Sequence, residues 1–179
     1  MIDPSNWVHS LAGGMHFACS VIGMLSGMFV LLNTKGTAFH RKIGYVFVTA
    51  LVGVNLSALF IYDFNDGAIS VFHFLIPVSL FFLGFGILPM MGKRKPGALN
   101  RHIIGMNGAV LGLWAAGATE YFVREIAFGL NKGELIMYSF MISFPFAIAI
   151  AVSIIYHQRR YFPGRLKQPS SSHELLHKE

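Results

Sequence analysis

Long apolar stretches constrain the fold of this chain more than any other feature. Each approaches or exceeds the roughly 20 residues that a helix needs to cross a bilayer, and short polar turns separate them. Inside lipid, a segment must satisfy its own backbone polar groups, so we expect each stretch to be a helix. The sequence therefore predicts an all-α, polytopic membrane protein. Its bundle of five transmembrane helices is expected over residues 8–33, 43–62, 69–91, 103–128 and 135–156.

The distribution of lysine and arginine predicts the orientation of this bundle. Basic residues precede the second and fourth stretches and follow the fifth, whereas only Arg124 and Lys132 fall on the other side. Because cytoplasmic loops of membrane proteins are enriched in such residues, we expect the N-terminus outside and the C-terminus in the cytoplasm. Residues 163–179 are expected to form a mobile cytoplasmic tail. The same pattern accounts for the net charge of +6, so the bilayer is the expected partner and nucleic acid is not.

Ionisable side chains within or beside the apolar stretches are the strongest indication of function, because such groups are costly at membrane depth. In the orientation given above, His16, His73 and Glu120 fall in an outer layer. His40 and His102 fall in an inner layer near the cytoplasmic face. His102 and Glu120 lie about five helical turns apart on one face of the fourth stretch. Both could therefore line one path across the bilayer.

These residues fit several kinds of chemistry. Two layers of histidines on different helices match a transmembrane di-haem cytochrome, in which each haem b iron takes two axial imidazoles. His16, His73, His40 and His102 are then the candidate haem ligands. Alternatively, His16, His73 and Glu120 could hold a transition metal. Histidine also titrates near neutral pH, which suits a proton path, and imidazole or arginine groups could hydrogen-bond a quinone.

Structural roles compete with these chemical ones. Glu120 and Arg124 are spaced i, i+4 and could form an ion pair within one helix. His40 and His102, each next to an arginine, could anchor helices at the membrane interface. Asn55 is expected to make an interhelical hydrogen bond. Small residues that recur along one face of the fourth stretch predict close helix packing: Gly105, Gly108, Gly112, Ala116 and Thr119.

A family resemblance adds to this interpretation. The run 36–47 (GTAFHRKIGYVF) contains the pair His40–Arg41 and follows a stretch that contains His16. With His102 followed by Met106, and Glu120 followed by Arg124, it resembles a family of bacterial predicted membrane proteins called domain of unknown function 2306. The resemblance implies a multi-pass protein of the bacterial inner membrane. It groups six residues as one set and leaves His73 outside it: His16, His40, Arg41, His102, Glu120 and Arg124.

Three hypotheses for function follow. The first is a redox role with bound haem or metal. The second is a proton-coupled transporter or channel subunit, which would require self-association into a homo-oligomer. The third is a non-catalytic assembly subunit of a larger membrane complex. The sequence contains no GxSxG motif and no Gly-rich phosphate loop, so hydrolase or transferase chemistry is not expected.

Overall fold

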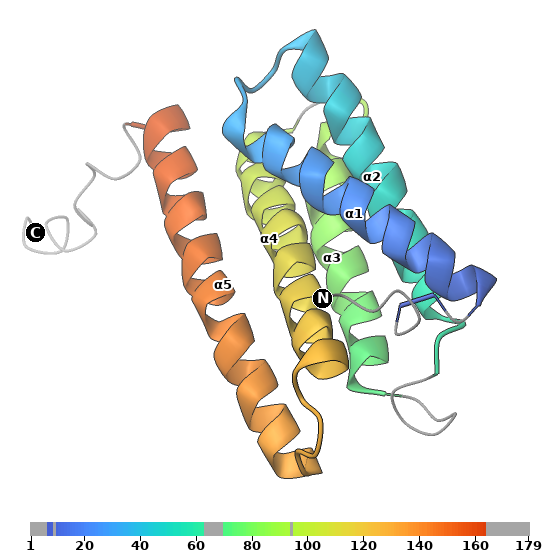
Figure 1. Ribbon diagram of the computed structural model, residues 1–179. Coiled ribbons are helices and arrows are strands. Elements are labelled where there is room, and N and C mark those ends of the chain that lie inside the picture. Colours follow the sequence, from blue (N-terminus) through green and yellow to red (C-terminus); the bar gives the residue numbers. More distant parts are fainter. Residues whose placement is uncertain (1–6, 9, 63–69, 94, 164–179) are drawn as a thin grey trace, which may run out of the picture.

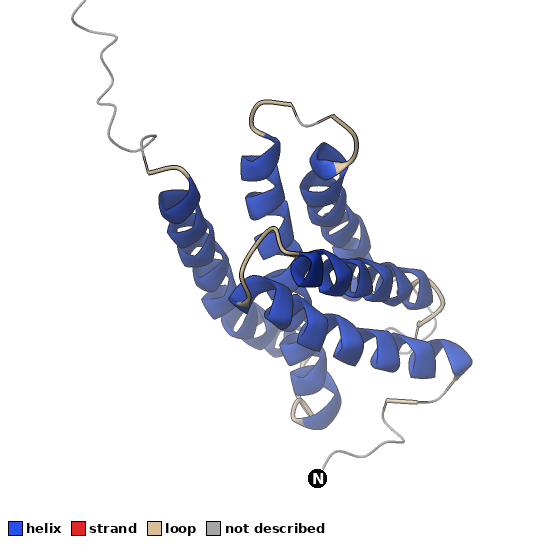
Figure 2. Ribbon diagram, turned by 90° about the horizontal axis from the view of Figure 1, so that it is seen from above, coloured by secondary structure: helices blue, strands red, loops and turns tan. Residues whose placement is uncertain are grey.

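A computed structural model describes residues 7–8, 10–62, 70–93 and 95–163, and Figure 1 shows how its helices are arranged. Within these residues there are helices and no strands (Figure 2), so the predicted all-α class is confirmed. Residues 164–179 of the expected cytoplasmic tail lie outside the described residues. The elements are α1 (Leu11–Leu32), α2 (Ala38–Ala58), η3 (Val71–Phe74), α3 (Leu75–Ile87), η4 (Leu88–Met90), α4 (Ala98–Glu125) and α5 (Lys132–Tyr161).

Three helical segments are long and apolar enough to cross a membrane by length and composition. They are Leu11–Leu32, Phe72–Met90 and Lys132–Tyr161. The second of these is not one uniform helix, because the 3₁₀ turns η3 and η4 flank α3. The helices α2 and α4 are also long, with 21 and 28 residues, but both contain charged turns that lower their hydropathy.

Three helices, α2, α4 and α5, begin before the apolar stretches that were predicted from the sequence, and α5 begins at Lys132 rather than Leu135. α2 begins at Ala38 rather than Ile43, because the Thr37 side chain caps it by accepting a hydrogen bond of 3.0 Å from the His40 N–H. α4 begins at Ala98, directly after Gly97, whose φ of 80° is left-handed. The hydropathy boundary and the helix boundary therefore differ. As a result, His40 and His102 lie within the opening turns of helices.

The helix α4 occupies the centre of the arrangement. It packs against α1, α3 and α5, while α1 also pairs with α2. Figure 1 shows α5 beside α4, on the side away from α2 and α3. Phe47 and Leu51 of α2 and Val110 of α4 are fully buried in one core cluster, to which α3 contributes Leu83. Large apolar side chains remain exposed on the outer surface, for example Phe140 on α5. Such an exterior is expected of a protein that contacts lipid.

Glycines allow α4 to approach its neighbours, although the predicted strip of small residues is not uniform. A Cβ added at Gly105 would lie 2.5 Å from the Gly86 Cα of α3. At Gly108 the added atom would overlap the Phe82 ring. At Gly112, by contrast, it would meet nothing within 4 Å. The expectation of close packing therefore applies to Gly105 and Gly108, whereas Gly112 makes no close approach.

Candidate functional site

A group of polar side chains joins α1 to α4 near the C-terminal end of α4. Glu120 is its centre. Arg124 Nε donates to Glu120 Oε1 at 3.0 Å, and His16 Nε2 lies 3.6 Å from Glu120 Oε2. All three side chains are largely buried, with exposed fractions of 16% for His16, 15% for Glu120 and 9% for Arg124. The i, i+4 ion pair within α4 is thus extended by a histidine from a different helix.

The other ring nitrogen of His16 contacts α2. Its Nδ1 lies 3.2 Å from both the Val54 carbonyl oxygen and Ser57 Oγ. The Ser57 hydroxyl has acceptors of its own, the carbonyl oxygens of Gly53 at 2.7 Å and Val54 at 3.0 Å. His16 Nδ1 therefore lies against two acceptors, and the network assigns a proton to it. The nitrogen next to Glu120 is Nε2.

Trp7 lies against one side of this group. The Arg124 guanidinium carbon lies 5.4 Å from the centroid of the Trp7 ring, a cation–π distance. Trp7 Nε1 donates to Glu125 Oε1 at 2.7 Å. The Phe17 and Tyr121 rings lie against the same indole, with centroids at 5.5 and 6.4 Å. These contacts attach Trp7 to the end of α4 and to Phe17 of α1.

His73 has partners of a different kind. It lies in η3, where its Nδ1 accepts a 3.2 Å hydrogen bond from the Ser70 N–H and its ring stacks on Tyr62 at 4.9 Å. No three His, Cys, Asp or Glu side chains among the described residues are placed to hold one metal ion. The structure therefore does not bring His73 together with His16 and Glu120 as a ligand set. The outer metal or haem site remains a prediction from the sequence.

His40 and His102 do come together, at the opposite end of the bundle. Their ring centroids are 6.5 Å apart and their planes meet at 78°. His102 Nδ1 donates to the Gly86 carbonyl oxygen at 2.8 Å. His40 Nδ1 is buried and has no hydrogen-bond partner within the portion of the chain that the structure describes. Arg41 Nη1 donates to the Gly36 carbonyl oxygen at 3.1 Å, so this arginine stabilises the turn between α1 and α2.

Apolar packing lies between the two polar ends of α4. Met106, Val110 and Leu113 are buried in the core between His102 and Glu120. His102 and Glu120, which were predicted to share one face of α4, therefore contact different helices. His102 contacts α2 and α3, whereas Glu120 contacts α1.

A third polar group was not anticipated from the sequence. Ser153 Oγ on α5 donates to Asn107 Oδ1 on α4, and Asn107 Nδ2 donates to the Ile103 carbonyl oxygen at 2.7 Å. His157 Nδ1 donates to the Ser153 carbonyl oxygen at 2.8 Å. Asn107 and His157 are both buried. The sequence did contain a signal for this group, because Asn107 and Ser153 are polar residues within two of the apolar stretches.

A separate polar contact joins α2 to α3, where Asn55 Nδ2 donates to Ser79 Oγ at 3.0 Å.

Comparison with known families adds one finding to this geometry. The profile of the family DUF2306, described as predicted membrane protein, matches residues 13–157. The chain belongs to the DUF2306 family. The resemblance inferred from the run 36–47 is thereby confirmed. Comparisons with curated proteins and with solved structures found no significant match.

The DUF2306 match encloses all three polar groups. The His16–Glu120–Arg124 group, the His40–His102 pair and the group around Asn107 lie within residues 13–157, whereas Trp7 precedes them. The family description identifies a membrane protein and names no activity. A function for this DUF2306 protein must therefore be inferred from its own contacts.

Proposed function

We propose that this DUF2306 protein spans the bacterial inner membrane five times, with its N-terminus outside, and works as a proton-coupled transporter or a subunit of one. The His16–Glu120 pair is its proton-binding site. The concentration of basic residues at one end of the helices favours this orientation. The lengths of α2 and α4, 21 and 28 residues, are sufficient for two further spans beside the three apolar ones.

The observation that carries this proposal is the position of His16 between a fixed acceptor pair and a carboxylate. With Nδ1 donating to Val54 and Ser57, the state of Nε2 determines its interaction with Glu120. A protonated Nε2 makes a charge-assisted contact with the carboxylate. An unprotonated Nε2 instead presents a lone pair to it. Loss of this proton therefore changes the contact between α1 and α4 from attraction to repulsion, and its gain reverses the change.

Arg124 sets the charge of the group. Together with ionised Glu120 it forms a neutral pair, so a neutral His16 leaves the three side chains with no net charge. Binding of one proton raises this to a single positive charge. In a partly buried, low-dielectric setting such a change alters interaction energies much more than it would in water. This sensitivity is what a proton-coupled conformational change requires.

The apolar core of α4 favours coupling through helix movement over an open channel. Met106, Val110 and Leu113 fill the space between the outer site and the inner histidines. A proton bound at His16 would thus act on the contact between α1 and α4. We include a homo-oligomer in this proposal, because a small bundle needs further helices to enclose a substrate path.

Reconstitution into liposomes with an internal pH-sensitive dye tests this function. We expect His16→Gln to abolish most proton-dependent flux while it keeps Glu120 and Arg124 paired. Glu120→Gln should have the same effect. His73→Gln is the matched control, because His73 contacts Ser70 and Tyr62 and is expected to leave flux unchanged. Unaltered proton and solute flux in both His16→Gln and Glu120→Gln would rule out the proposal.

A cofactor at the inner histidines is a second candidate function. It is favoured by the 6.5 Å separation of the His40 and His102 rings and by the burial of His40 Nδ1, which has no hydrogen-bond partner among the described residues. Two imidazoles from different helices could bind a haem b iron or a transition metal in a redox role, or could hydrogen-bond a quinone. An absorption spectrum, elemental analysis and quinone extraction of purified protein test this candidate. A cofactor that is present in the wild type and lost in His40→Ala would support it, and wild-type protein without any of the three would refute it.

A further inference from the structure

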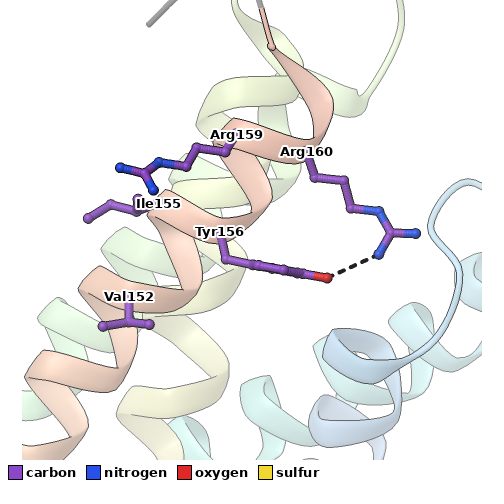
Figure 3. A pocket seen from close by; sticks show the side chains of 5 residues that line it. All are labelled: Val152, Ile155, Tyr156, Arg159 and Arg160. Atoms are coloured by element: carbon purple, nitrogen blue, oxygen red, sulfur yellow. Dashed lines mark hydrogen bonds between the residues drawn. The ribbon is translucent and has the colours of Figure 1, made fainter.

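A shallow groove on α5 combines an apolar strip with two arginines. Val152, Ile155, Tyr156, Arg159 and Arg160 line it (Figure 3). The side chains of Val152, Ile155 and Tyr156 are 60%, 47% and 56% exposed. Arg159 and Arg160 follow them at the end of the helix and are exposed as well. The groove thus places two guanidinium groups about one helical turn beyond a set of exposed apolar side chains.

Charges are strongly separated between the two ends of the helices. The acidic residues that the structure describes, Glu120, Glu125 and Glu134, lie at the end formed by the C-terminus of α4 and the N-terminus of α5. The end that carries the groove has no described acidic residue. Described basic residues gather there instead: Lys35, Arg41, Lys42, Lys93, Lys95, Arg101, Arg159 and Arg160.

Arg160 lies close enough to Lys35 for the two positive charges to repel each other. Its Nη1 donates to the Tyr156 hydroxyl at 3.2 Å, and Figure 3 shows both side chains directed toward the side of the bundle formed by α1 and α2. Burial lowers the pKa of Lys35 in the turn after α1, and the nearby positive charge of Arg160 lowers it further. Lys35 Nζ meanwhile donates to backbone carbonyl oxygens, including that of Val30 at 2.7 Å. No acidic residue among the described ones lies at this end to neutralise these cations.

We propose that this groove binds an anionic phospholipid, with its headgroup between Arg159 and Arg160 and an acyl chain along Val152 and Ile155. Guanidinium groups bind phosphate oxygens through paired hydrogen bonds. The exposed apolar side chains one turn earlier match the lipid tail, which a soluble phosphate lacks. The Tyr156 hydroxyl holds Arg160 at one side of the groove, and Figure 3 shows Arg159 at the other side. A basic site near the end of a membrane helix is also where an anionic headgroup is attracted electrostatically.

Native mass spectrometry of the full chain in mild detergent tests this site. The probes are phosphatidylglycerol and phosphatidylcholine with identical acyl chains, each titrated against the protein. We expect preferential retention of phosphatidylglycerol. Arg159→Gln and Arg160→Gln should each weaken that retention about fivefold, the effect of one basic residue near an anionic surface. Soluble glycerol 3-phosphate at the same concentration should not displace the lipid.

Lys132→Gln is the matched control, because Lys132 is an exposed basic residue at the other end of the same helix. It should leave phosphatidylglycerol binding unchanged. Arg160→Lys keeps the charge but loses the planar fork, and we expect it to bind more weakly than the wild type and more tightly than Arg160→Gln. Equal retention of the two lipids, or equal loss in Lys132→Gln and Arg160→Gln, would overturn the proposal. So would displacement by glycerol 3-phosphate.

Discussion

Gly105→Ala offers a direct test of how α3 and α4 pack. The added Cβ would lie 2.5 Å from the Gly86 Cα and 2.6 Å from the Phe82 carbonyl oxygen. These are backbone atoms, which cannot move aside as a flexible side chain can. To reach an ordinary contact of about 3.5 Å, the two helices must separate by roughly 1 Å. The bond from His102 Nδ1 to the Gly86 carbonyl oxygen, now 2.8 Å, would then be stretched beyond hydrogen-bond distance.

The magnitude follows from these two effects. Overpacking of a tight contact typically costs about 1–3 kcal/mol, and loss of one hydrogen bond adds about 1 kcal/mol. Replacement of a helical glycine by alanine stabilises the helix by about 1 kcal/mol, because alanine has the higher helix propensity. The free energy of unfolding should therefore fall by about 2 kcal/mol. For a chain of this size, that corresponds to a decrease of roughly 4–8 °C in Tm.

Thermal unfolding in mild detergent, followed by circular dichroism, measures this change. Gly112→Ala is the matched control on the same helix, because its added Cβ meets nothing within 4 Å. We expect that variant to be as stable as the wild type or slightly more stable. If Gly105→Ala unfolds at the wild-type temperature, or if both variants lose the same stability, the close approach of α3 and α4 is incorrect.

Two further predictions concern polar contacts between buried groups. In a double-mutant cycle of Asn55→Leu and Ser79→Ala, the interhelical hydrogen bond should appear as a coupling of about 0.6 kcal/mol in the free energy of unfolding; strictly additive effects would contradict it. Glu120→Gln should cost about 3 kcal/mol, because the largely buried Arg124 loses its carboxylate partner. The double variant Glu120→Gln/Arg124→Gln should be more stable than Glu120→Gln alone in the same unfolding assay, and a further loss of stability would refute this explanation.

The helix boundaries show how far hydropathy alone can predict this fold. Apolar stretches located every α-helix that the structure describes, because burial in lipid requires continuous apolar segments with internally satisfied backbone groups. They placed the start of α2 at Ile43, although the helix begins at Ala38. Hydropathy measures transfer to lipid, whereas a helix begins where a cap satisfies its free N–H groups. The Thr37 cap and the left-handed Gly97 are local signals of that second kind.

The partner of a side chain was predictable only within one helix. The i, i+4 spacing of Glu120 and Arg124 anticipates their ion pair, because residues at this spacing are neighbours on a helix. Nothing in the spacing indicates that His16 meets Glu120. The same holds for the pairing of His40 with His102, and for the separate position of His73 beside Tyr62.

The amino-acid sequence alone established the helical class, the family, the separation of charge along the helices and the set of ionisable residues that need an explanation. Which of those residues meet was visible only in the three-dimensional structure. It also distinguished Gly105 from Gly112 and joined Asn107 to Ser153. The physical reason is that helical periodicity relates side chains along one helix. The choice of partner helix depends on the fit between surfaces that are all apolar, and such surfaces look alike in sequence.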